Sequence, residues 1–229
     1  MSETMTMTMT KTVILALIVA MNISAQQMIS SKGIELIQDD LKSGIISQEE
    51  ALVQKFRFGF NKAKLNEKYK IKNDKPSKCG TAIISEYNKS KLTLKPEIIN
   101  EIESYLSFEK FNTSASSKLI SPSGKFELTY SVDGLNAVPS RDSDLNGVPD
   151  YVEWIADYFD HSWAYSIDTL GFLAPPIGNG MYKISFENMD YYGYTNTSTL
   201  PGMTYIVMHN NYNGFSPNTD PEGNQKGAA

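Results

Sequence analysis

Within residues 31–65, apolar positions recur every three or four residues, the spacing that places them on one face of an α-helix. Gly44 interrupts the pattern and predicts the end of a first helix. Ser47, with Glu50 three positions on, forms a capping box and predicts the start of a second helix. The apolar positions of the two helices are Ile34, Ile37, Leu41, Ala51, Leu52 and Phe56.

Further along the chain, the period changes to two. Residues 125–134 alternate apolar and polar side chains up to an Asp-Gly turn, which predicts a half-buried strand. Residues 181–188 and 203–210 predict two more strands, separated by a Tyr-, Gly- and Asn-rich loop at 190–202. The small and polar residues 112–124 are typical of a linker.

A second helical stripe begins at Tyr151. Because helices come first and are followed by a strand, this helix and two further strands, the order of elements predicts an α+β fold. The predicted apolar positions of the helix are Val152, Trp154, Ile155, Tyr158, Phe159 and Trp163, and the predicted polar ones are Glu153, Asp157, Asp160 and His161.

The segment that leads into this helix, residues 142–153, reads DSDLNGVPDYVE and crowds four carboxylates into twelve positions. Like charges 4 Å apart repel by about 1 kcal/mol per pair even in water, so we expect a bound cation to offset the repulsion. The order of oxygen-bearing residues, with Gly147 in sixth place, matches an EF-hand-like calcium loop. The predicted ligands are Asp142, Asp144, Asn146, Val148 through its carbonyl oxygen, Asp150 through a water, and Glu153.

Pro149 stands at the eighth position of this loop and has no N–H for the β-bridge that joins paired calcium loops. The loop is therefore expected to work alone, with Ca²⁺ in a structural role at an affinity of about 10⁻⁴–10⁻³ M. The alternative is a solvated acidic turn.

The net charge and its distribution along the chain limit which partners can be expected. A net charge of −5 gives no reason to expect nucleic acid. Residues 55–95 carry twelve basic against three acidic residues, whereas residues 133–229 carry three basic against twelve acidic. The first stretch is either a solvated basic surface or a pro-segment that docks on the acidic part.

The N-terminus predicts export. Lys11, an apolar run from Val13 to Met21 and a small residue at Ala25 are typical of a secretory signal peptide, with an N-terminal core helix as the alternative. Nine apolar residues fall well short of the roughly 20 that a membrane span needs. We therefore expect a secreted or periplasmic protein without a membrane span.

Residues that carry chemistry are few. Cys79 is the only cysteine, so an internal disulfide and a cysteine-based zinc site are excluded, and its thiol is either buried or paired with another chain. His161 is expected to lie solvated beside Asp157, and His209 ends a predicted strand, where a ligand role is the alternative. The sequence contains no HExxH, GxSxG or P-loop motif, so it has no recognisable active site.

From about Ser47 to Ala229 the chain resembles the N-terminal portion of a family of exported bacterial zinc metalloproteases. The calcium loop is also similar to the solitary loops of thrombospondin type 3-like repeats. The stretches that carry the resemblance are ISQEEALVQKFRFGFNKAKLNEKY, SPSGKFELTYSVDGLNAVPSRDSDLNGVPDYVEWIADYFDHSWAYSIDTLGFLAPP, YKISFENMDYYGYT and TYIVMHNNYNGF.

The resemblance implies a zincin-like mixed sheet, and a zinc site on an HExxH helix that would follow the last stretch. This sequence lacks that motif, so the chain is expected to be truncated at Ala229, with a natural C-terminus as the alternative. The resemblance also implies that strand 203–209 is the edge along which a protein or peptide substrate lies. The expected domains are a signal peptide (1–25), a basic, propeptide-like helical region (26–117) and a calcium-binding α+β domain (118–229).

Two functions are compatible with these patterns. In the first, the chain is the calcium-binding N-terminal portion of an exported zinc-metallopeptidase-like protein, with Zn²⁺ bound only where the missing motif is present. In the second, it is a non-catalytic, calcium-stabilised binding or adhesion module that recognises a protein or glycan through the Tyr-rich residues 191–215. Enzymatic activity and oligomeric state stay open.

Overall fold

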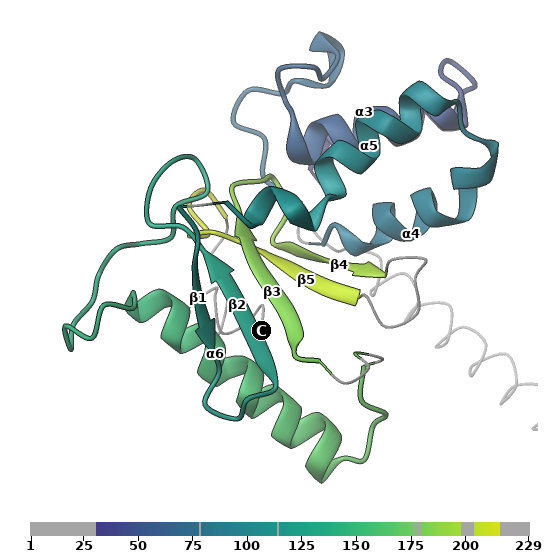
Figure 1. The fold of residues 1–229 in the computed structure, drawn as a ribbon. Helices are drawn as coiled ribbons and strands as arrows, with labels where there is room; N and C mark the ends of the chain where they lie inside the picture. The colour runs from purple at the N-terminus through teal and green to yellow at the C-terminus, as the bar shows by residue number, and fades with distance from the viewer. Residues whose placement is uncertain are drawn as a thin grey trace, which may run out of the picture. The chain divides into compact units, whose positions relative to one another are not determined.

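The computed structural model describes residues 31–77, 79–113, 115–175, 177, 180–197 and 204–215. The predicted signal peptide and the residues after Phe215, including the expected truncation point, lie outside this part. The described residues form an α+β fold, as the sequence predicted, and their sheet is mixed and has five strands, two more than were predicted (Figure 1).

Five α-helices are described, with short helical turns between them. No helix in the described ranges is long and apolar enough to cross a membrane. The α-helices are α2 (Lys32–Lys42), α3 (Gln48–Phe60), α4 (Thr81–Ser90), α5 (Pro96–Leu106) and α6 (Asp150–Trp163). The turns are η1 (Glu67–Tyr69), η2 (Lys91–Thr93), η3 (Phe108–Phe111) and a π-helical turn, η4 (Ala164–Thr169).

The two predicted N-terminal helices are confirmed, together with the residues that start and end them. The Ser47 hydroxyl accepts a hydrogen bond from the Glu50 amide at 3.1 Å and caps α3. Gly44 follows α2 with φ +69°, a left-handed conformation that favours glycine. Ile34 and Ile37 are buried, so the apolar face of α2 packs as its periodicity indicated.

The sheet has the strand order β1-β2-β3-β5-β4. The three inner strands are parallel, and the two outer strands each run antiparallel to their neighbour. The strands are β1 (Ser117–Ile120), β2 (Phe126–Tyr130), β3 (Tyr182–Glu187), β4 (Gly193–Thr197) and β5 (Thr204–His209).

Three expectations about this sheet are wrong. The segment 112–124 contains β1, and the segment 190–202 contains β4, although both were predicted to be irregular. The strand at 203–209 is not an edge, because β5 pairs with β3 on one side and with β4 on the other. The edge strands are β1 and β4.

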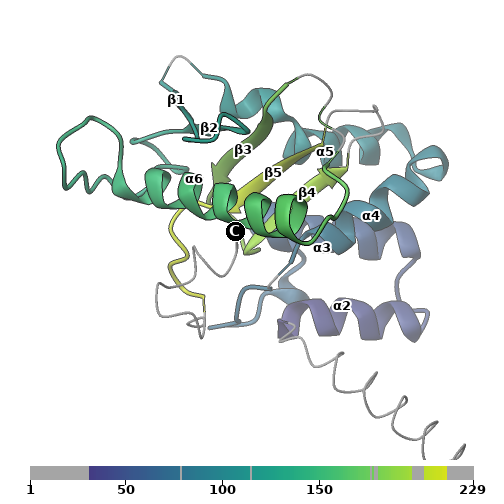
Figure 2. The same cartoon turned by 90° about the horizontal axis from the view of Figure 1, so that it is seen from below.

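Helices cover both faces of the sheet. Figure 2 shows α6 along one face, and the helices before β1 lie toward the other. Side chains of β5 alternate between two apolar cores: Met208 packs with Val152 and Ile155 of α6, whereas Val207 packs with the N-terminal helices. Trp154 is 39% exposed, so its predicted place in the buried stripe is wrong.

Ion pairs join the helical part to the sheet at two points. Lys62 pairs with Asp190 at 2.6 Å, and Lys110 pairs with Glu187 at 2.7 Å. Other basic residues find acidic partners within the helical part itself, and that part also shares an apolar core with β4 and β5. The domain boundary near residue 117 and the propeptide role stay predictions. The pairs inside the helical part include Lys55–Glu86, Arg57–Glu101, Lys68–Asp40 and Lys91–Glu103.

We predict that Gly59→Ala destabilises the protein. A Cβ at this position of α3 would lie 1.9 Å from Cε2 of Tyr191, so the fully buried ring must move. Overpacking of this kind costs about 1–3 kcal/mol in the free energy of unfolding, measured by urea denaturation. Gly180→Ala is the control, because its Cβ would meet the nearest of the described atoms, the Ile177 carbonyl oxygen, at 3.7 Å. Equal stability of the two variants would contradict the prediction.

Candidate calcium-binding loop

The loop at residues 142–153 follows β2, ends in the first turn of α6 and closes at its base. The amide of Asp150 donates to the Arg141 carbonyl at 2.8 Å, so the residue that opens the helix is tied to the residue before the loop. Pro149 precedes the first turn of α6 with φ −60°, which suits its ring. The loop therefore fixes the direction in which α6 starts.

The buried side chain of Asp150 stabilises the closed base of the loop. Its residue is only 6% exposed, and its carboxylate accepts from the Ser143 amide at 2.7 Å and from the Ser143 hydroxyl at 2.6 Å. Arg141 Nε lies 3.1 Å from the same carboxylate. These hydrogen bonds, and then the Arg141 charge, lower the pKa of Asp150. The carboxylate predicted to bind calcium through a water is thus directed toward Ser143 and Arg141.

The carboxylate of Asp142, the first residue of the loop, stabilises the turn of the backbone by accepting hydrogen bonds from two later amides. Asp142 accepts from the Asn146 amide at 3.2 Å through one oxygen and from the Gly147 amide at 2.9 Å through the other. Gly147 has φ +88°, which confirms that the chain turns there in a conformation costly for a residue with a Cβ. Leu145 also adopts a positive φ, +60°, and its side chain is exposed.

Asn146 brings two further carboxylates together. Its Nδ2 donates to Asp144 at 3.0 Å and to Glu153 at 2.7 Å, so oxygens from the third and twelfth positions converge on one atom. Its Oδ1 accepts from the Val148 amide at 2.8 Å. The side-chain NH₂ of Asn146 therefore occupies the point where the two negative groups meet.

The residue types of the loop fit calcium, which binds six to eight oxygens at 2.3–2.6 Å. In the described part of the chain, however, no group of three or more acidic, His or Cys side chains is already arranged around a metal position. For the loop to bind an ion, the Asn146 amide must rotate so that its oxygen replaces its nitrogen between Asp144 and Glu153. Asp142 accepts one amide hydrogen bond on each oxygen, so each oxygen keeps a lone pair with which it could bind the ion while these contacts stay in place.

The histidines and the cysteine of the described ranges do not fit a zinc site. His161 is exposed on α6, whereas His209 is buried at the end of β5. His209 Nδ1 accepts from the amides of Asn211 at 3.1 Å and Tyr212 at 2.7 Å, so that nitrogen is already used by a turn. Cys79 is exposed, and the alternative of a buried thiol is wrong.

The tyrosines of residues 191–215 do not form the surface that the binding hypothesis expected. They extend into the two cores, where burial raises their pKa values and keeps them neutral. The buried ones are Tyr191, Tyr194, Tyr205 and Tyr212.

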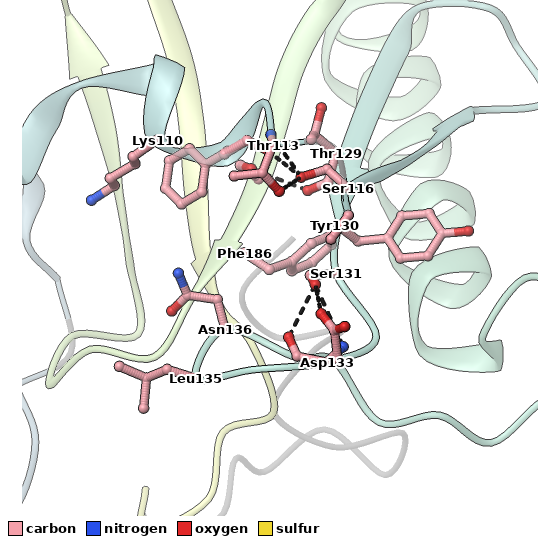
Figure 3. A pocket seen from close by; sticks show the side chains of 13 residues that line it. Lys110, Thr113, Ser116, Thr129, Tyr130, Ser131, Asp133, Leu135, Asn136 and Phe186 are labelled. Carbon is pink, nitrogen blue, oxygen red and sulfur yellow. Dashed lines mark hydrogen bonds between the residues drawn. The ribbon is translucent and has the colours of Figure 1, made fainter.

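A cavity of about 220 Å³ lies beside the end of β2 and is lined by hydroxyl groups (Figure 3). The Thr113 and Ser116 hydroxyls lie 2.9 Å apart, and the Ser131 hydroxyl donates to Asp133 at 3.0 Å. Among the described residues, the Thr129 hydroxyl has no hydrogen-bond partner although its atom is buried. The lining is therefore polar, and most of these hydroxyl groups already have hydrogen-bond partners within it.

A larger cavity of about 480 Å³ lies between η3 and the face of the sheet that the N-terminal helices cover. Glu127 in its wall is held by Lys183 at 2.8 Å and by Lys118 at 2.9 Å, and these lysines lower the pKa of Glu127. This carboxylate is thus ionised and paired, which does not suit it to serve as a general acid.

No family model, no curated protein and no solved structure matches this chain.

Sequence reasoning did not anticipate two features of the loop. The Asp150 carboxylate is held by Ser143 and Arg141, and the Asn146 amide bridges two carboxylates. Arg141 next to an acidic loop was a usable indication of the first feature. The second depends on a side-chain rotation that sequence does not specify.

We predict that lowering the pH from 7 to 4 destabilises the fold through His209. Burial lowers its pKa to about 4, whereas the unfolded ring takes up a proton near 6.5, so the unfolded state gains protons first. The contribution of the neutral ring is complete above pH 6.5 and is lost toward pH 4, by roughly 1–3 kcal/mol.

Urea unfolding followed by tryptophan fluorescence across this pH range measures the loss. His209→Asn is the comparison, since its side-chain oxygen can still accept from the turn amides but does not titrate. Superimposable pH profiles for the two proteins would rule out this role of His209.

Proposed function

We propose that this chain is the calcium-binding portion of an exported, zinc-metallopeptidase-like protein. The ion would be structural: it would hold residues 142–153 and so fix the start of α6 against the sheet. Export rests on the sequence pattern of residues 1–25, which lie outside the described part.

The observation that carries the calcium proposal is the convergence of Asp144 and Glu153 on one amide group. Two carboxylates that approach the same point repel each other, and a divalent cation would offset this repulsion more strongly than a neutral NH₂. Glu153 belongs to the first turn of α6, whereas Asp144 belongs to the loop. An ion shared between them would thus tie the loop to the helix.

The metallopeptidase part of the proposal has separate support. The sequence resemblance implies it, and a mixed sheet with an antiparallel edge strand, β4, is compatible with a zincin-like arrangement. The resemblance assigns zinc and the catalytic glutamate to an HExxH motif that these 229 residues do not contain. We therefore assign no catalytic step to the described residues.

A non-catalytic binding module is the second candidate, and the hydroxyl-lined cavity beside β2 favours it. The Thr129 hydroxyl in its wall is buried and has no hydrogen-bond partner among the described residues, so it could bind a polar group of a small ligand. Both candidates require the calcium loop, so calcium binding is the first property to test.

We predict that 10 mM Ca²⁺ stabilises the wild-type protein relative to EDTA. At a Kd of about 10⁻⁴–10⁻³ M, the ion contributes roughly 1.4–2.7 kcal/mol, which raises the Tm by several degrees. Asp144→Ala should abolish this rise and the heat of binding in calorimetry. Asp157→Ala, which removes an exposed carboxylate from the outer face of α6, should retain both. A wild-type Tm that is the same with EDTA and with calcium would defeat the proposal.

We predict that Asn146→Asp destabilises the protein in EDTA but strengthens its binding of calcium. The substitution replaces the NH₂ between Asp144 and Glu153 with a third carboxylate, so in EDTA the Tm should fall. In calcium the added oxygen is a ligand, so the Kd measured by calorimetry should decrease by about three- to tenfold. A Tm that falls equally in both conditions would show that the loop is an acidic turn held together by its amide.

A further inference from the structure

On the face of the sheet opposite α6, the part formed by β2 and β3 is polar although it is buried. Side chains alternate along a strand, and Leu128 and Ile184 belong to the α6 core, so Thr129 and Ser185 face the other way. Thr129 is 1% exposed and Ser185 is 0% exposed. On the next strand, the residue paired with Ser185 is the apolar Val207. Since a buried hydroxyl costs free energy unless it forms a hydrogen bond, the two polar positions need partners that an apolar core would not require.

The two hydroxyl groups differ in whether that need is met. The Ser185 hydroxyl donates to the Thr129 carbonyl at 3.1 Å. The Thr129 hydroxyl has no hydrogen-bond partner among the described residues. Because Thr129 lies in the wall of the cavity of about 220 Å³, a molecule that fills this cavity can supply the missing partner.

The position and the size of the cavity suit a small ligand. The lining residues Thr129 and Ser185 lie toward the carboxyl ends of two parallel strands, β2 and β3, where open parallel sheets commonly bind ligands. Each water in the liquid takes up roughly 30 Å³, so the volume corresponds to about seven waters. This space can take one small ring. The exposed Asp133 belongs to the same lining, so the rest of a larger ligand can extend into solvent.

The charges of the lining do not select an anion. The Lys110 ammonium group pairs with Glu187 at 2.7 Å and also donates to the Tyr105 carbonyl, so it is already neutralised. Of the described lining residues, Asp133 is the charged one without an ion pair, and its carboxylate accepts from the Ser131 hydroxyl at 3.0 Å. A negatively charged ligand would therefore be repelled by Asp133.

The polar groups of the lining include a donor as well as an acceptor. The Asn136 Oδ1 accepts from the Asn188 amide at 3.0 Å, which leaves the Asn136 NH₂ to donate. In Figure 3, Thr129 lies toward one end of the cavity, and Asp133 and Asn136 lie toward the other. An ammonium group can only donate and a carboxylate can only accept, whereas a hydroxyl group does both. A ligand with several hydroxyl groups thus suits the donor and the acceptor together, and Phe111 adds an apolar part to the wall.

We propose that this cavity binds one uncharged sugar unit, and that the Thr129 hydroxyl is the group at its buried end that hydrogen-bonds the sugar. Asp133 and Asn136 would bind further hydroxyl groups of the same ring at the open end. The proposal deepens the second candidate function, the non-catalytic binding module, and rests on it.

The experiment titrates three neutral sugars into the ¹⁵N-labelled full chain and follows the amide signals by NMR. The probes are methyl α-D-glucopyranoside, methyl α-D-mannopyranoside and methyl β-D-galactopyranoside, whose methyl group stands for the rest of a glycan. At least one should bind with a Kd of about 10 mM or lower and shift the amides of residues 129–136 and 185–186. The uronate of that sugar should bind at least tenfold more weakly, because Asp133 repels its carboxylate.

Thr129→Val separates a ligand-binding hydroxyl from a structural one. The substitution removes a buried group that has no partner in the free chain, so the free energy of unfolding in urea should be equal or higher. The best sugar should nevertheless bind at least tenfold more weakly. Thr204→Val is the matched control, because the Thr204 hydroxyl is also buried without a partner among the described residues but lines the larger cavity. It should bind the sugar as the wild type does.

Asp133→Asn tests the open end at an exposed position and should reduce the difference between the neutral sugar and its uronate to less than threefold. If none of the three sugars shifts these amides, the cavity holds water alone and the proposal fails. It also fails if Thr129→Val binds the sugar as tightly as the wild type, or if the uronate binds as tightly as the neutral sugar. None of these outcomes depends on calcium, so calorimetry of the loop distinguishes a failure here from a failure of the proposed function.

Discussion

The way the N-terminal helices lie on the sheet depends on one buried side chain, Tyr191. Its ring fills the space that Gly59 leaves in α3, and its hydroxyl donates to the Lys55 carbonyl at 3.1 Å. The same ring contacts Phe58 and Phe60, and Gly80, the residue before α4, approaches it at the chain's turn into that helix. A buried tyrosine needs both apolar contacts and a partner for its hydroxyl, and α3 supplies both. Two glycines far apart in sequence are thus required by one aromatic ring.

Local patterns predicted the parts of the fold that have local causes. Helical spacing and a Ser47 cap were enough for α2 and α3, and the alternation from Phe126 to Tyr130 was enough for β2. By contrast, β1 and β4 are short edge strands with few apolar residues, so they carry almost no periodic pattern. They are strands because distant segments pair with them. The order of the strands is likewise a property of tertiary packing. The edge position expected for β5 came from the resemblance, and its pairing with both β3 and β4 overturns it.

The loop at 142–153 shows the same division. Its oxygen-bearing residues and the left-handed Gly147 follow from spacing alone. The direction in which each side chain points does not, because Asp150 is drawn to Arg141 and Ser143 by charge and hydrogen bonds that compete with a role as a ligand. Trp154 was assigned to the buried stripe as one of the apolar positions of the helix. Its side chain is exposed, since Val152 and Ile155 lie on the buried face.

The sheet separates two apolar cores, one beneath α6 and one beneath the N-terminal helices. The acidic loop adjoins the first core through Val148, and Gly80 adjoins the second through Tyr191. Only strands whose side chains alternate between the faces, such as β5 with Val207 and Met208, belong to both. Energetic coupling between the two faces must therefore pass through the twist and spacing of these inner strands. Since packed interiors are nearly incompressible and transmit strain, a displacement of β5 on the α6 face would also be felt by the N-terminal helices on the opposite face.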